Sequence, residues 1–163
     1  MTRQSPLSRK LAGLKAQSAG KAFEAQFETI CRQNNFTCIR IPNGCRTIPF
    51  KPYLIRTKSP FDFAISHKGF SVYLDVKSTE SDSFTYSKLD QAQIRTLNDA
   101  RKDSLSGYII HFTTVNKIVF FDVRILKALQ PRSSLKIEDG ITLGTFGYQC
   151  DLYLLKQIKF DQI

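Results

Sequence analysis

The chain has 163 residues, of which 42% are hydrophobic and 23% are charged, proportions ordinary for a single globular domain with a substantial core. It contains no apolar run near the roughly 20 residues of a membrane span, and its polar N-terminus lacks the apolar segment of a secretory signal, so we expect a cytoplasmic protein without membrane partners. The net charge is +10, and residues 1–60 carry 11 lysine and arginine residues against only two glutamates. This concentration indicates either a polyanion-binding surface or a solvated basic tail.

The first third of the chain predicts a basic arm followed by a helix. Residues 1–17 are rich in lysine, arginine, serine and glutamine, so we expect a flexible arm ahead of a single domain over residues 18–163. A helix is expected over residues 19–33, because Phe23 and its apolar successors recur at helical spacing. Glu24 borders that apolar stripe, where it either points toward the edge of the core or remains in solvent.

Two segments of different character follow the helix. Residues 36–41 alternate in polarity and predict a strand, and the turn after it contains proline and glycine. Residues 45–59 are irregular, with prolines, cations and aromatic residues interleaved. They predict either an extended loop or projecting hairpin that contacts nucleic acid, or a loop packed on its own domain.

Residues 59–77 form the stretch around which the candidate site is built. They predict a β-hairpin whose two-residue turn is Lys68-Gly69, a register that places Asp62 directly opposite Asp75 with Lys77 on the same face. The other face is then wholly apolar, which supports the register. Its facing residues are expected to be Phe61, Phe63 and Ile65 on one arm and Val76, Leu74 and Val72 on the other.

The second half of the chain predicts a further helix and two buried strands. The helix is expected over residues 88–102, the strands over 108–112 and 117–121, and a short helix from Asp122 to about Leu129. Two weak elements of undefined type are expected at 141–143 and 152–158. The order of elements predicts an α+β or α/β domain with a mixed β-sheet flanked by helices.

Two facing carboxylates repel each other unless a cation lies between them, so this pair points to a divalent metal. Mg²⁺ held by Asp62 and Asp75, with Glu24 completing the outer coordination, would leave room for water and a phosphate. Lys77 beside it could orient or deprotonate that water or offset developing negative charge. This set of groups suits phosphodiester hydrolysis.

The run Pro60-Phe61-Asp62, followed after thirteen residues by Asp75-Val76-Lys77, resembles the PD-(D/E)xK nuclease motif. Residues 84–94 and the strand beginning at Gly107 resemble more closely the Holliday junction resolvases of the RecU type. There the motif lysine precedes a polar Ser/Thr-rich stretch and a helix carrying glutamine, which is Gln93 here. The chain departs from that family in three ways: it has aspartate at position 75 where glutamate is usual, Ala92 replaces a histidine, and the projecting stalk is shortened to about residues 45–58.

The resemblance implies a restriction-endonuclease-like core and a Mg²⁺-dependent endonuclease that resolves four-way DNA junctions by paired nicks. It implies metal ligands at Asp62 and Asp75, a contribution from Glu24, a catalytic Lys77 and an active-site Gln93, with Mn²⁺ able to substitute for Mg²⁺. The partners implied are branched DNA and a second copy of the chain in a homodimer, in the cytoplasm of a bacterial cell or of a phage-infected host.

The basic residues ahead of the motif are the candidates for contact with DNA. They are Arg9, Lys10, Lys15, Lys21, Arg46, Lys51, Arg56 and Lys58. Two alternatives remain open from the sequence: a related PD-(D/E)xK endonuclease that acts on another DNA structure or sequence, and a relative that only binds DNA.

Overall fold

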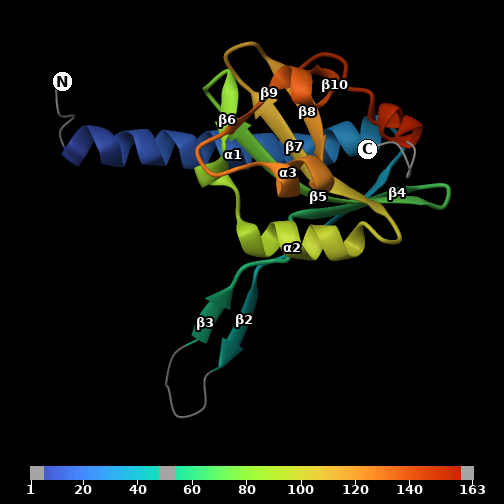
Figure 1. Ribbon diagram of the computed structural model, residues 1–163, viewed down its shortest axis with the longest axis horizontal. Helices are drawn as coiled ribbons and strands as arrows, with labels where there is room; N and C mark the ends of the chain where they lie inside the picture. Colours follow the sequence, from blue (N-terminus) through green and yellow to red (C-terminus); the bar gives the residue numbers. More distant parts are fainter. Residues whose placement is uncertain (1–5, 48–53, 159–163) are drawn as a thin grey trace.

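The computed structural model describes the backbone of residues 6–47 and 54–158, and the side chains of residues 20–44 and 58–158 (Figure 1). Within these ranges, no helix is both long and apolar enough to cross a membrane.

A six-stranded mixed sheet forms the centre of the molecule, with strand order β1-β4-β5-β7-β8-β10. Strands β5 and β7 are parallel, and every other neighbouring pair in this sheet is antiparallel. Its members are β1 (Thr37–Arg40), β4 (Phe63–His67), β5 (Phe70–Thr79), β7 (Leu105–Phe112), β8 (Lys117–Asp122) and β10 (Ile141–Thr145). Two smaller antiparallel pairs accompany it: β2 (Gly44–Thr47) with β3 (Leu54–Thr57), and β6 (Ser83–Thr85) with β9 (Ser134–Lys136).

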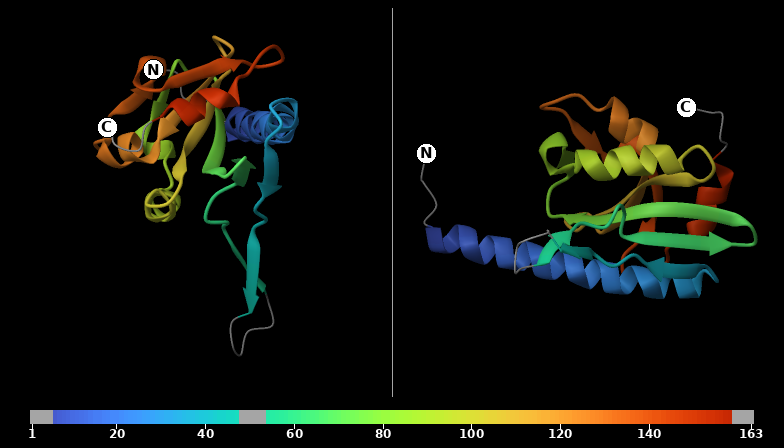
Figure 2. Two further views of the ribbon diagram at one scale, coloured as in Figure 1. Left: turned by 90° about the vertical axis from the view of Figure 1, so that its right-hand side faces the viewer. Right: turned by 90° about the horizontal axis from the view of Figure 1, so that it is seen from below.

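Helices cover both faces of this sheet (Figures 1 and 2). The long helix α1 lies against one face, while α2 and α3 cover the other. The α-helices are α1 (Pro6–Gln33), α2 (Gln91–Ala100) and α3 (Val123–Ala128), and the 3-10 helices are η1 (Tyr86–Lys88), η2 (Ile137–Asp139) and η3 (Leu152–Gln157). The predicted fold class, a mixed β-sheet flanked by helices, is confirmed.

Two hydrophobic cores arise from the alternation of side chains along the central strands. Ile109 of β7 and Phe120 of β8 pack with α1, and their sequence neighbours Tyr108 and Phe121 pack with α2 and α3. All eight residues of β7 are buried because the strand lies in the middle of the sheet with helices on both sides. The same alternation along β5 sends Val76 into the α1 core and turns Asp75 and Lys77 toward α2.

The register of the β4–β5 hairpin is the predicted one. Phe63 pairs with Leu74 and His67 with Phe70, and the turn residues Lys68 and Gly69 both have positive φ, at 49° and 79°, as a two-residue type I′ turn requires. One part of the prediction is wrong: the Phe61 ring packs on Tyr73 on the α2 side of the sheet, with centroids 5.0 Å apart. The reason is that the regular strand begins only at Phe63, so the alternation does not extend back to residue 61.

The predicted projecting hairpin is present as β2 and β3, which pair antiparallel and extend away from the domain (Figures 1 and 2). A hydrogen bond closes its base: the amide of Ser59 donates to Asn43 Oδ1 at 2.9 Å. The alternative of a loop packed on its own domain does not hold for the two described strands.

Several element boundaries differ from the predicted ones. Helix α1 begins at Pro6 rather than near residue 19, so it includes residues assigned to the basic arm, whose flexibility stays a prediction. The polar stretch after β5 contains an unpredicted strand, β6, which pairs with β9. The two weak elements at the end of the chain are a strand, β10, and a 3-10 helix, η3.

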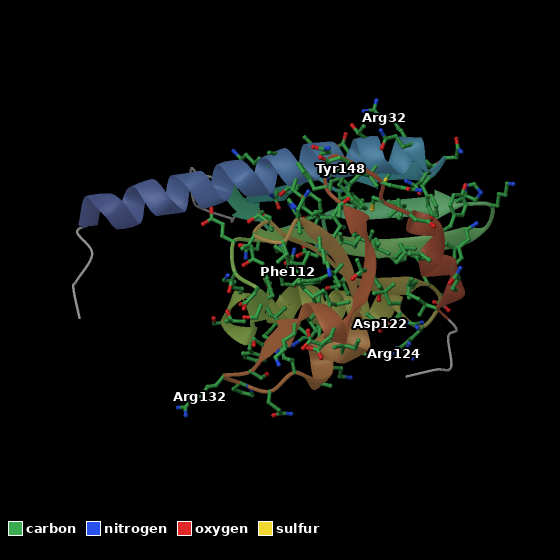
Figure 3. The ribbon with its side chains drawn as sticks, turned by 90° about the horizontal axis from the view of Figure 1, so that it is seen from above. Arg32, Phe112, Asp122, Arg124, Arg132 and Tyr148 are labelled. Carbon is green, nitrogen blue, oxygen red and sulfur yellow. The ribbon has the colours of Figure 1, made fainter. Side chains whose placement is uncertain are left out.

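Asp122 begins α3 as predicted, and its carboxylate is shared between two arginines. It accepts from the backbone amide of Arg124 at 2.9 Å and from the side chains of Arg124 and Arg101, each at 3.1 Å. Asp122 and Arg124 lie side by side in Figure 3. Because Asp122 is only 3% exposed, this network satisfies a charge that would otherwise be costly to bury.

Candidate active site

The predicted carboxylates and lysine meet where β4 begins and β5 passes beside it. Asp75 lies on β5 and is fully buried, while Asp62 immediately precedes β4 and is partly exposed. The ammonium of Lys77 contacts both carboxylates: it is 3.5 Å from Asp62 Oδ2 and forms a closer ion pair with Asp75 Oδ2. The facing pair predicted from the hairpin register is therefore bridged by a cation of the protein itself.

Hydrogen bonds fix the orientation of each carboxylate. The backbone amide of Val76 donates to Asp62 Oδ2 at 3.0 Å. Gln93 Nε2 donates to Asp75 Oδ1 at 2.8 Å, in a contact that is buried on both sides. Gln93 comes from α2, so the helix predicted to present this residue does bring it to the carboxylates.

Burial governs the electrostatics of the site. It raises the pKa of Asp75 to about 8, with Asp62 adding to the rise and Lys77 opposing it. Burial by itself would lower the pKa of Lys77, but the two carboxylates outweigh it and hold that pKa above its ordinary value. Lys77 therefore keeps its charge at neutral pH, whereas the proton on Asp75 is released only at mildly alkaline pH or when another cation replaces it.

Tyr108 lies beside Asp75 and Lys77 and was not among the predicted residues. It pairs with Asp75 in the parallel register of β5 and β7, and its ring centroid lies 5.8 Å from Lys77 Nζ. An aromatic face at this distance attracts an ammonium ion. Tyr108 therefore helps hold Lys77 beside the two aspartates.

The donor set at this site fits a hard divalent cation. Carboxylate oxygens are the ligands that Mg²⁺ prefers, and Mg²⁺ is commonly held by one or two carboxylates together with waters and phosphate oxygens. Asp62 and Asp75 could supply these two carboxylates. Among the described residues, no cluster of three or more acidic, histidine or cysteine side chains has the arrangement of a metal site.

Glu24 has a different environment from that of the two aspartates. It belongs to α1, on the face of the sheet opposite Asp75, and it forms an ion pair with Arg40 of β1. Arg40 also lies 3.9 Å from Glu28. Among the described side chains, no contact joins Glu24 to Asp62 or Asp75, because α1 and α2 cover opposite faces of the sheet.

The predicted DNA-contacting residues fall on two parts of the molecule, helix α1 and the projecting hairpin. Lys21 is exposed on α1, and Lys58 is exposed directly after β3, where it pairs with Asp90. Lys51 lies outside the described residues. Five further residues have a described backbone, but their side chains lie outside the described residues: Arg9, Lys10 and Lys15 on α1, Arg46 on β2 and Arg56 on β3.

Asp90 is the second residue that sequence reasoning missed. It is the N-cap of α2, where its side chain accepts from the amides of Ala92 and Gln93. The signal was available, because an aspartate followed three residues later by glutamine is a pattern typical of a helix start. Because the helix was expected to begin near residue 88, Asp90 was placed inside it rather than at its N-cap.

Comparisons with known proteins identify the family and the fold of the chain. The recombination protein U family matches residues 29–157, a range that contains Asp62, Asp75, Lys77 and Gln93 but excludes Glu24. The solved structure of Hjc, a Holliday junction resolvase of Archaeoglobus fulgidus, is similar with a TM-score of 0.56 and 16% identity, over 76% of this chain and 95% of that chain. At this identity the likeness establishes the fold. A search of curated proteins finds no match.

The family match covers most of the chain, including the whole central sheet and helix α2. The chain belongs to the recombination protein U (RecU) family.

Proposed function

We propose that this protein is a Mg²⁺-dependent endonuclease that resolves four-way DNA junctions by paired nicks. The observation that carries the proposal is the pair of carboxylates bridged by Lys77 in a member of the recombination protein U family. The archaeal neighbour named as a Holliday junction resolvase supports the choice of substrate, since it has the same fold.

The residues of the site have distinct roles in this proposal. A bound Mg²⁺ would supply a Lewis acid that polarises the phosphate and lowers the pKa of water. Asp62 and Asp75 would hold that ion, and Gln93 keeps Asp75 oriented by occupying its Oδ1. Lys77, charged and held between the carboxylates, would stabilise the negative charge that develops on the phosphate or orient the attacking water.

The remaining parts of the proposal concern DNA and assembly. Cations on α1 and the β2–β3 hairpin would bind the DNA backbone, since each phosphate they neutralise releases counterions. Mn²⁺ would be accepted in place of Mg²⁺. Paired nicks require two sites, so the active form would be a homodimer acting in the cytoplasm of a bacterial cell or phage-infected host.

A cleavage assay on matched substrates tests the proposal. A four-way junction, its component duplex, a Y-shaped DNA and a single strand, all of related sequence, are incubated with the protein in Mg²⁺, Mn²⁺ or EDTA. We expect symmetric nicks in the junction with either metal, none in EDTA, and at least tenfold slower cleavage of the other substrates. Asp62→Asn is the inactive control, because asparagine keeps the acceptor for the Val76 amide and removes the charge.

The outcomes separate the alternatives. Equal cleavage of duplex and junction would show a related endonuclease with another substrate, and DNA binding without cleavage in either metal would show a relative that only binds DNA. Unchanged cleavage by Asp62→Asn would remove the carboxylate pair from the mechanism.

A further inference from the structure

The base of the β2–β3 hairpin is tied directly to helix α2. Lys58 follows β3, and its Nζ lies 2.7 Å from Asp90 Oδ2. The neighbouring Ser59 is only 7% exposed, and its amide is bonded to Asn43 on the other side of the hairpin base. Figure 1 shows the hairpin leaving the domain beside α2. The contact between Lys58 and Asp90 therefore joins the hairpin base to the start of α2.

Asp90 uses its second carboxylate oxygen to hold the first turn of α2. Oδ1 accepts from the amide of Ala92 at 3.0 Å and from the amide of Gln93 at 3.4 Å. The hydrogen bond to Lys58 lowers the pKa of Asp90, so the carboxylate is charged and can serve both partners at neutral pH. One side chain thus links the hairpin base to the backbone of Gln93.

Gln93 carries the link to the candidate active site. The residue is 8% exposed, and its side-chain amide donates to Asp75 Oδ1 at 2.8 Å. This hydrogen bond is sensitive to small movements of Gln93, because a hydrogen bond weakens steeply as its distance and angle change. A shift of about 1 Å in the first turn of α2 would alter the orientation of the buried carboxylate.

We propose that Asp90 is a positioning residue that couples the β2–β3 hairpin to the catalytic carboxylate Asp75 through Gln93. The inference rests on the proposed function, in which the hairpin contacts DNA and Asp75 holds the metal ion. DNA bound to the hairpin would then set the orientation of Asp75, so that cleavage is favoured when the substrate is correctly seated.

The strength of this coupling follows from the exposure of its first contact. The Lys58 side chain is 80% exposed and that of Asp90 is 23% exposed, so solvent screens the pair and its contribution is modest. A contact of this strength changes a rate by about threefold, which is enough to bias the site without making it rigid.

Three variants and a control test the coupling. Asp90→Asn keeps an N-cap oxygen but loses the ion pair with Lys58, and Lys58→Gln removes the same pair from the other side. The double variant combines them. Asp99→Asn, on an exposed position of the same helix, is the control for the change in charge. Single-turnover cleavage of a four-way junction is measured at saturating DNA and Mg²⁺, so that the rate reports chemistry and the DNA titration reports affinity.

We expect each single variant to slow the saturated rate about threefold, the double variant to be no slower than the slower single variant, and the control to match the wild type. Effects that multiply in the double variant would overturn the proposal. So would changes confined to DNA affinity, which would make Lys58 only a phosphate contact.

A second measurement does not depend on cleavage. The side-chain amide signals of Gln93, followed by ¹⁵N NMR in the DNA-free protein, should shift in Asp90→Asn and Lys58→Gln but not in Asp99→Asn. If the wild type cleaves none of the DNA substrates, the proposed function fails while this readout still decides the coupling. Unshifted Gln93 signals in both variants would refute it.

Discussion

Replacing Asp75 with asparagine is expected to stabilise the metal-free protein while abolishing metal-dependent cleavage. Asp75 is fully buried, and burial raises its pKa from the ordinary 3.8 to about 8. The unfolded chain releases this proton near pH 4, whereas the folded protein keeps it until about pH 8. The folded protein therefore binds more protons between these values, and its free energy of unfolding falls as the pH rises through that window.

The size of the effect follows from the same two values. Raising a carboxyl pKa from 3.8 to about 8 corresponds to a loss of about 6 kcal/mol above pH 8. Asparagine has no such proton to release, and its amide oxygen can still accept the hydrogen bond from Gln93. It cannot form the ion pair with Lys77, however, which offsets part of the gain in stability. We therefore expect a net gain of about 2 kcal/mol at pH 8, and a smaller gain or none near pH 4.

Urea unfolding followed by circular dichroism, in EDTA at pH 5 and pH 8, measures this difference. Asp99→Asn, an exposed change of the same chemical kind, should leave the stability within about 0.5 kcal/mol of the wild type. Mn²⁺ at 100 times its Kd should stabilise the wild type by about 2.7 kcal/mol and leave Asp75→Asn unchanged. A variant that is no more stable than the wild type at pH 8, with the same pH dependence, would refute the reasoning.

Three other variants address the site and the DNA contacts. Lys77→Ala should slow single-turnover cleavage at least 100-fold while DNA affinity, measured by fluorescence anisotropy, stays within about threefold; a wild-type rate would exclude a catalytic role. Gln93→Ala leaves the buried Oδ1 of Asp75 without its hydrogen-bond donor. The free energy of unfolding in urea should therefore fall by about 1–3 kcal/mol, and cleavage should slow. No change in either quantity would contradict the contact. Arg9, Lys10 and Lys15 can be replaced together with glutamine, which preserves helix propensity. This variant should bind DNA more weakly, and the slope of log affinity against log salt concentration should become shallower by about one for each lost phosphate contact. An identical slope would show that this end of α1 does not contact DNA.

The parts of the fold that were predictable are those with a strong local signal. The β4–β5 register followed from two-residue alternation and from Lys68-Gly69, which can adopt the positive φ of a tight turn. The start of α1 was less predictable, since the helix begins at Pro6 in a polar basic segment where only three leucines, Leu7, Leu11 and Leu14, recur at helical spacing. The strand β6 has only three residues and is defined by its partner β9, about 50 residues further along the chain, so local sequence carries little sign of it.

The sequence by itself determined which groups can perform the chemistry, because the spacing of Asp62, Asp75 and Lys77 along a hairpin puts them on one face whatever surrounds them. Only the tertiary structure decided which other groups join them. Gln93 reaches Asp75 because α2 packs on that face, whereas Glu24 pairs with Arg40 because α1 packs on the other. The link from Lys58 through Asp90 is likewise invisible in sequence, since it joins residues 32 apart through the packing of a hairpin base on a helix end. Hairpin geometry is local, whereas the packing of helices on a sheet depends on contacts between distant parts of the chain.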